Sequence, residues 1–219
     1  MIGILGGTFD PVHHGHLRCA VEVQQGCELR ELWFMPCGQP PHRRLPLADA
    51  GQRLAMLEAA TADQPGFTVD ARELRRNGPS YTVDTLLSLR EELPEAPLCL
   101  LLGMDAFLGL PSWHRWERII ELAHVIVMCR PGADPAPAPA PLRELLAARR
   151  VESARELRRR PAGGILLQTV TQLDISASRI RELIAHGRSV RYLLPDRVLE
   201  HIRRERLYLD IPMGETELA

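Results

Sequence analysis

The chain opens on a short apolar run that meets two glycines, a turn and a cluster of histidines. The run Met1–Leu5 predicts a first buried strand that ends at Gly6-Gly7, and Phe9-Asp10-Pro11 predicts a fixed turn, since proline sets φ and removes a donor. His13-His14-Gly15-His16 then leads into a helical pattern. Free backbone N–H groups and the positive end of a helix dipole would point one way here. With imidazoles as extra donors, the stretch predicts a site for the phosphates of a nucleotide.

Other interpretations of this stretch are a P-loop, a dinucleotide fingerprint, a zinc cluster or a plain surface turn. The Gly-Lys-Ser/Thr of a P-loop and the G-x-G-x-x-G spacing are both absent. The three histidines also suit zinc, although neither HExxH nor a paired CxxC accompanies them. Phosphate binding is favoured over surface histidines because the imidazoles cluster directly after a glycine turn.

Composition narrows the class of protein. A chain of 219 residues, 45% of them hydrophobic, predicts one α/β domain with a real core. A net charge of −1 argues against bulk binding of nucleic acid. Five scattered cysteines predict reduced thiols in a cytoplasmic protein. Residues 1–5 are too short for the apolar region of a signal peptide, so none is expected. No apolar run reaches the ~18 residues that a membrane span needs, so no membrane partner is expected.

Strands and helices alternate along the chain. Further strands are expected at 31–35, 67–70, 98–103, 124–129 and 164–170, and helices at 17–25, 49–62, 83–93, 117–122, 142–157 and 197–206. The pattern predicts a Rossmann-like, doubly wound parallel sheet with helices on both faces. A single domain is expected over 1–209, with a Pro/Ala-rich connection at 133–141 and a loose tail at 210–219.

Several candidate ligand-binding residues follow the carboxyl ends of expected strands, where open α/β sheets bind ligands. His42 and Arg43 lie in a proline-rich loop, where they can meet phosphates or be simply solvated. Asp105 can cap the next helix or bind ribose hydroxyls. Trp113 either offers a stacking surface for a flat ring or packs under the helix expected at 117–122, and such packing is favoured for Trp116.

Two later helix starts are candidate anion sites. Ser176, Ser178 and Arg181 lie at the start of a helix. No Glu follows at capping-box spacing, so helix capping is not expected to account for the whole motif, and an anion can bind there. Thr82 is a candidate N-cap for the helix 83–93, and the free N–H groups there can equally hold a ligand carboxylate.

The opening motif resembles the signature of the HxGH nucleotidyltransferases, relatives of the class I aminoacyl-tRNA synthetases. It consists of Gly6-Gly7-Thr8-Phe9-Asp10-Pro11 followed by His13-x-Gly15-His16. Further segments, in order, make more than half of the chain similar to the nicotinate-mononucleotide adenylyltransferase family: Pro40–Arg43, Ser80–Thr82, Gly103–Asp105, Pro111–His114 and Ile175–Arg181. The last is similar to that family's ISSTxIR, with Ala177 and Ser178 in place of its second Ser and its Thr.

The resemblance implies transfer of an adenylyl group from ATP to nicotinate mononucleotide, with Mg²⁺ accompanying ATP. It implies that His13 and His16 hold the triphosphate, with His16 nearest the α-phosphate. The other ATP-binding positions that it implies are Gly6, Gly7, Thr8, Phe9, His42, Gly103, Asp105, Ser176, Ser178 and Arg181. For the mononucleotide it implies Arg43, Tyr81, Thr82, Trp113, His114 and Arg130.

The expected mechanism has no general base, because the attacking phosphate oxygen is already an anion near pH 7. Cationic groups, helix starts and Mg²⁺ are expected to screen the repulsion between the two substrates, so direct displacement is predicted. The open alternatives are nicotinamide mononucleotide as substrate, a phosphopantetheine adenylyltransferase, and a nucleotide-binding regulator without turnover. The oligomeric state is also open and includes a homo-oligomer.

Overall fold

The computed structural model describes residues 1–40, 45–132 and 138–209. Within them a seven-stranded sheet has the order β3-β2-β1-β4-β5-β7-β6, and all neighbouring strands run parallel. The strands are β1 (Ile2–Gly7), β2 (Glu31–Pro36), β3 (Phe67–Val69), β4 (Leu98–Gly103), β5 (His124–Cys129), β6 (Arg150–Val151) and β7 (Ile165–Thr169). The helices are α1 (His14–Gly26), α2 (Ala50–Thr61), α3 (Thr82–Glu92), α4 (Met104–Leu108), α5 (Trp116–Leu122), α6 (Ala140–Arg149), α7 (Ala154–Leu157), α8 (Ala177–Ala185) and α9 (Asp196–Arg204), with 3₁₀ turns η1 (Arg72–Arg75) and η2 (Leu110–Ser112).

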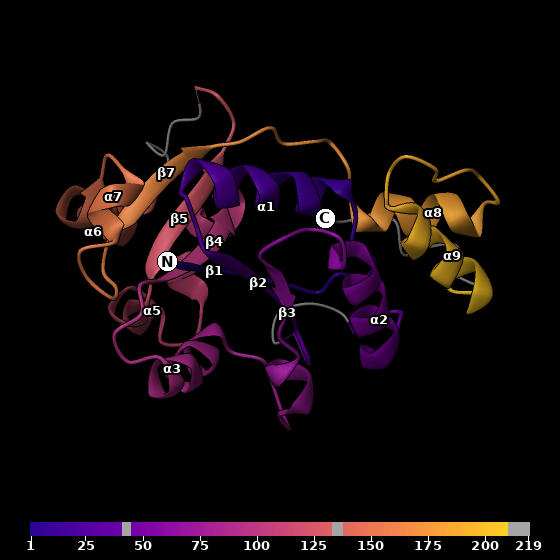
Figure 1. The fold of residues 1–219 in the computed structure, drawn as a ribbon, viewed down its shortest axis with the longest axis horizontal. Coiled ribbons are helices and arrows are strands. Elements are labelled where there is room, and N and C mark those ends of the chain that lie inside the picture. The colour runs from indigo at the N-terminus through magenta and orange to yellow at the C-terminus, as the bar shows by residue number, and fades with distance from the viewer. Residues whose placement is uncertain (41–44, 133–137, 210–219) are drawn as a thin grey trace.

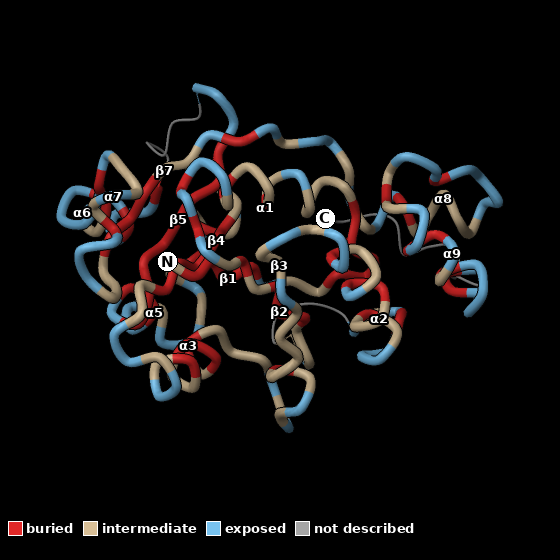
Figure 2. The backbone as a smooth tube through the Cα atoms, in the orientation of Figure 1, coloured by how far each residue is buried: buried red, intermediate tan, exposed pale blue. Residues whose placement is uncertain are grey.

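Helices cover both faces of the sheet, with α1 on one face and α3 and α5 on the other (Figure 1). Side chains of β4 alternate between the two layers, as a pleated strand requires. Cys99 and Leu101 join the apolar cluster under α1 and α2, whereas Leu98, Leu100 and Leu102 join the cluster under α3 and α5. Figure 2 shows the strands buried between these layers. The predicted Rossmann-like, doubly wound sheet is confirmed.

The strand order reverses between β1 and β4. From β1 the chain moves outward through β2 and β3, and it then returns to pair β4 with the other edge of β1, at Ile4↔Leu100 among others. In open α/β sheets, ligands bind at such a switch point, beyond the carboxyl ends of the strands. Here those ends are Gly7 and Gly103.

Two boundaries at the opening motif differ from the sequence-based expectation. β1 continues through Gly6 and Gly7, because both remain paired in the ladder with β2, up to Gly7↔Pro36. α1 begins at His14, three residues before the expected start at 17, because His13 is extended (φ −147°, ψ 170°) and acts as the N-cap. The histidine cluster therefore belongs to the helix start itself.

The expected helix 142–157 is wrong as a single element. It is divided into α6 and α7 by the short strand β6, which pairs with β7. Ser153 starts α7 in a capping box with Glu156, which satisfies the first N–H groups of the new helix. α6 begins at Ala140, inside the expected 133–141 connection, of which 133–137 lie outside the described residues.

The last two helices extend the first layer sideways. Ile180 of α8 and Val198 and Ile202 of α9 join the apolar cluster under α1, and α9 also contacts α2. Figure 1 shows the pair beside α2, beyond the end of α1 that begins at His14. No described helix is long and apolar enough to cross a membrane.

We expect Leu101→Ala to lower the free energy of unfolding by about 2–5 kcal/mol, the usual result of leaving a cavity in a packed core. Leu101 is 1% exposed at the centre of the sheet. The matched control is Leu45→Ala, since Leu45 is 75% exposed and should tolerate truncation with little change. Urea denaturation of both variants would measure the difference, and equal losses would contradict the assigned core.

Candidate functional site

The turn after β1 brings two imidazoles together at the start of α1. The rings of His13 and His16 stack with centroids 3.7 Å apart and planes inclined by 27°. Phe9, in the left-handed region at φ +50°, packs edge-on against His16 at 5.2 Å. The backbone N–H of His13 donates to Nδ1 of His16 at 3.3 Å. Because that nitrogen accepts, a neutral His16 carries its proton on Nε2, where it is a donor.

Gly15 makes this packing sterically feasible. A Cβ at Gly15 would lie 2.9 Å from Nδ1 of His13, so only glycine lets that ring cover the first turn of α1. At the strand ends the situation is the opposite. A Cβ added at Gly6 or at Gly103 would meet no atom of the described residues within 4 Å. Open space therefore borders the carboxyl ends of the neighbouring strands β1 and β4.

Burial keeps both imidazoles neutral. Desolvation, with a smaller contribution from His14, lowers the pKa of His13 to about 4, and desolvation together with His13 lowers the pKa of His16 to about 3. Nδ1 of His13 is buried and has no partner within the described residues. An unfolded histidine takes up a proton near pH 6.5, so these groups reduce stability as the pH falls from about 6.5 toward 4. An arriving phosphate would favour the protonated forms instead.

The start of α8 reaches the same turn. Arg181 donates from one guanidinium nitrogen to the carbonyl of Asp10 at 2.6 Å and from the other to Oγ of Ser178 at 3.2 Å. Oγ of Ser176 accepts from the N–H of Arg179 at 3.2 Å. The prediction that capping leaves both serines unused is therefore wrong for Ser176, because an N-cap serine needs no Glu partner. The two predicted anion sites nevertheless lie side by side.

A second group of candidate residues forms around the start of α3. Tyr81, and not Thr82, is the N-cap of this helix, and its side chain makes no cap hydrogen bond. The ring of Tyr81 lies 4.4 Å from that of His114, inclined by 35°. Trp113, next in the chain to His114, is partly buried against the second apolar cluster, as is Trp116. The start of α3 thus meets the segment that follows η2.

The predicted phosphate-binding residues His42 and Arg43 lie outside the described residues. The chain before them is nevertheless attached to the start of α3. The N–H of Ser80 donates to the carbonyl of Gln39, and the N–H of Gly38 donates to Oγ of Ser80, each at 2.9 Å. The loop that carries His42 and Arg43 therefore begins beside Tyr81.

Two other candidates occupy separate positions. Arg130 is exposed after β5, and its Nε donates to Oε1 of Gln172 at 3.0 Å. Asp105 is exposed in the first turn of α4, whose N-cap is Gly103, so the alternative that Asp105 caps this helix is wrong. Among the described residues, no group of three or more His, Cys, Asp and Glu side chains is arranged to hold a metal ion.

Three buried polar residues around the turn were not predicted as part of the site. Arg53 of α2 is 1% exposed, and its guanidinium donates to the carbonyl of Thr8 at 2.8 Å. Burial lowers the pKa of Arg53, and Asp10 opposes that shift. Tyr208, beyond α9, donates to the carboxylate of Asp10 at 2.7 Å. The sequence held one signal for Arg53. It precedes the core positions Met56 and Leu57 by three and four residues, which places it on the same face of α2.

Known proteins are similar to this chain over most of its length. Residues 4–183 match the cytidylyltransferase-like family. A protein of Methylococcus capsulatus named probable nicotinate-nucleotide adenylyltransferase is 55% identical over 95% of this chain and 99% of its own length. A protein of Acidithiobacillus ferrooxidans with the same name is 52% identical over 94% of each chain. The chain belongs to the nicotinate-nucleotide adenylyltransferase family.

Solved structures of nicotinate-nucleotide adenylyltransferases share the fold. The Plasmodium falciparum nicotinic acid mononucleotide adenylyltransferase complexed with NaAD has a TM-score of 0.70 and 17% identity, covering 94% of this chain and 96% of that one. The same enzyme complexed with APC has a TM-score of 0.68. The family membership expected from the opening motif together with the later segments is confirmed.

In this family member, the imidazole resonances of His13 and His16 should stay at their neutral positions between pH 8 and 5.5, because burial opposes protonation. An ordinary histidine titrates near pH 6.5. Proton–carbon NMR of the ligand-free protein would measure this, with His13→Gln and His16→Gln variants assigning the two signals. Titration of either signal near pH 6.5 would show that the rings are not buried as described.

Proposed function

We propose that this chain transfers the adenylyl group of ATP to nicotinate mononucleotide, which gives deamido-NAD and pyrophosphate, in the biosynthesis of NAD. The observation that carries the proposal is the meeting of two helix starts at the Asp10–Arg181 hydrogen bond, beside two stacked imidazoles. Curated relatives named for this reaction cover nearly the whole chain. The cytoplasmic location expected from the sequence is part of the same proposal.

On the ATP side, the triphosphate would bind between the starts of α1 and α8. His13 and His16 would contact it, with Nε2–H of His16 nearest the α-phosphate. Its remaining oxygens would bind backbone groups of Gly6, Gly7, Thr8 and Phe9 and the side chains of Ser176, Ser178, Arg181 and His42. Asp105 would bind the ribose beside Gly103, where a Cβ would have no neighbour within 4 Å among the residues described, which supports a close approach of ligand.

On the mononucleotide side, the backbone N–H groups of Tyr81 and Thr82 would bind the pyridine carboxylate. An anion is favoured at the start of α3 because its N–H groups are free and its dipole is positive there. Trp113 would stack on the ring with His114 beside it, and the Tyr81–His114 contact supports this grouping. Arg43 and Arg130 would bind the phosphate of the mononucleotide.

The reaction would be a single in-line displacement at the α-phosphorus. A phosphate oxygen of the mononucleotide forms the new bond, the bond to the bridging oxygen of the β-phosphate breaks, and its electron pair leaves with pyrophosphate. The attacking oxygen is already anionic, so no proton must be removed from it. The protein would hold the two anions in line and stabilise charge that develops on the transferred group.

The metal in this proposal is Mg²⁺ that arrives with ATP, and it would neutralise charge on the phosphates. Mg²⁺ commonly binds substrate phosphates with few protein carboxylates. The residues described here fit that mode, since the buried carboxylate of Asp10 already accepts from Leu47, Ala48 and Tyr208. Among the proposed site residues, Asp105 is the one with a carboxylate, and it is exposed.

A pyrophosphate-release assay tests the reaction. With ATP and Mg²⁺, nicotinate mononucleotide should support faster release than nicotinamide mononucleotide, because N–H donors at α3 favour a carboxylate over an amide. Pantetheine phosphate should support none. Equal rates with the two mononucleotides would remove the proposed specificity, and no release with either would refute the enzyme itself.

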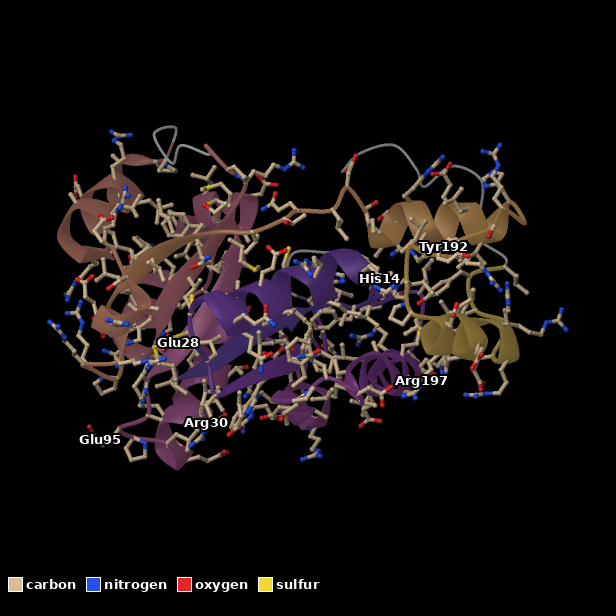
Figure 3. The ribbon with its side chains drawn as sticks, turned by 45° about the horizontal axis from the view of Figure 1, so that its top comes forward. His14, Glu28, Arg30, Glu95, Tyr192 and Arg197 are labelled. Carbon is tan, nitrogen blue, oxygen red and sulfur yellow. The ribbon has the colours of Figure 1, made fainter. Side chains whose placement is uncertain are left out.

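His16→Ala should lower kcat by about 10²–10³, the usual effect of losing a donor to developing charge, while the melting temperature changes little. The matched control is His14→Ala. His14 lines a shallow hollow with Leu173 and Tyr192, and Figure 3 shows His14 and Tyr192 near the junction of α1 with the α8–α9 pair. Near-normal turnover of His16→Ala, or an equal loss in both variants, would count against the assigned role.

A further inference from the structure

The carboxylate of Asp10 is buried within the site and is saturated by donors from distant parts of the chain. It is 4% exposed. Oδ2 accepts from the N–H of Leu47 at 2.9 Å, and Oδ1 accepts from the N–H of Ala48 at 3.1 Å. Oδ1 also accepts from the hydroxyl of Tyr208 at 2.7 Å, across a sequence separation of 198 residues. No role in binding or catalysis has been given to Tyr208 above.

Two guanidinium groups interact with this carboxylate. Arg53 interacts electrostatically with Asp10 while it donates to the carbonyl of Thr8. Arg181 donates to the carbonyl of Asp10, but its nitrogen stays 3.8 Å from the carboxylate oxygen Oδ2. Arg181 therefore makes no direct hydrogen-bonded ion pair with Asp10. The two groups form an ion pair at 3.8 Å, but no N–H of the guanidinium is used in a hydrogen bond to this carboxylate.

The position of Tyr208 is specific. After α9 the chain turns back through Arg206 at φ +54° and Tyr208 at φ +65°, a conformation that residues other than glycine rarely adopt. The N–H of Leu207 donates to the carbonyl of Ile202 at 3.0 Å and fixes this return. Leu207 and Tyr208 are then buried in the cluster that contains Phe9 and Ile180. The hydroxyl held this way donates to Asp10 at 2.7 Å.

We propose that Tyr208 is a positioning residue for ATP, which acts by saturating Asp10 so that Arg181 remains available to the triphosphate. Without the hydroxyl, the buried carboxylate lacks one donor, and a nitrogen of Arg181 lies only 3.8 Å from its Oδ2. A direct hydrogen bond from Arg181 would replace the lost donor, because a buried carboxylate that loses a hydrogen bond is costly. The guanidinium would then point at Asp10 and not at ATP. This inference rests on the proposed role of Arg181 in binding the triphosphate.

The primary variant is Tyr208→Phe, which keeps the ring and removes only the hydroxyl. We expect KM and Kd for ATP to rise about tenfold, the scale of one lost hydrogen bond to a charged group. KM for nicotinate mononucleotide should stay within about twofold of the unaltered protein, since Tyr208 does not reach the start of α3 in this account. A purely structural role would instead lower the melting temperature and leave the ratio of the two KM values unchanged.

The matched control is Tyr192→Phe. Tyr192 also has a positive φ, of 70°, but it is 82% exposed, and Figure 3 shows it on the α8–α9 side of the molecule. Losing its hydroxyl should change neither KM value. A control that weakens ATP binding as much as Tyr208→Phe would overturn the proposal.

A double-mutant cycle tests whether Tyr208 acts through Arg181. In an Arg181→Ala background, Tyr208→Phe should change the calorimetric Kd for ATP by less than about twofold, because the residue that it positions is absent. A further tenfold loss would show that Tyr208 acts by another route. An unchanged Kd for Tyr208→Phe alone would also refute the proposal.

A measurement on the unaltered chain remains decisive if Tyr208→Phe does not fold. Coupling is reciprocal, so ATP should slow amide hydrogen exchange around 206–209. Absence of slowing at saturating ATP would contradict the proposal. Failure of the proposed enzyme function can be distinguished from failure of this proposal. In the first case the unaltered protein releases no pyrophosphate, while ATP binding and its dependence on Tyr208 can still be measured.

Discussion

Parallel pairing on both edges of β1 determines how this protein is organised. Because β2 and β4 both run parallel to β1, the carboxyl ends of all three strands meet at one edge of the sheet. The crossover helices α1 and α3 lie on opposite faces, and their starts approach that edge from both sides. Two positively polarised helix ends can therefore face one crevice. The chemistry proposed above depends on this arrangement.

Around the turn after β1 the protein combines neutral donors with guanidinium groups. The imidazoles of His13 and His16 have a lowered pKa and offer hydrogen bonds, while Arg181 contributes a guanidinium that donates to the carbonyl of Asp10. Such a set suits a reaction between two anions. Neutral donors can lie close together without mutual repulsion, and their strength rises where water is excluded.

The sequence was most informative where the chemistry is local. The opening turn, the histidine pair and the start of α8 are contiguous motifs, and the alternation of strands and helices predicted the sheet. Helix boundaries were less certain. The division of 142–157 depends on β6 pairing with β7, a contact that periodicity within the segment does not encode.

The buried support of the site could not be predicted in the same way. The bond between Tyr208 and Asp10 joins the two ends of the described chain, and it depends on positive φ values at Arg206 and Tyr208. Neither residue type signals such a conformation. Arg53 is the one residue of this support that the sequence indicates. An arginine on the apolar face of α2 is buried on folding, and a buried charge needs hydrogen-bond or ionic partners.

The close approach of Gly15 to the ring of His13 restricts how this motif can change over evolution. With 2.9 Å between that ring and the point where a Cβ would stand, any larger residue at position 15 displaces the imidazole at position 13. The imidazole of His13 can therefore keep this place only while position 15 is glycine. A descendant of this chain that retains the ring in this place must also retain Gly15.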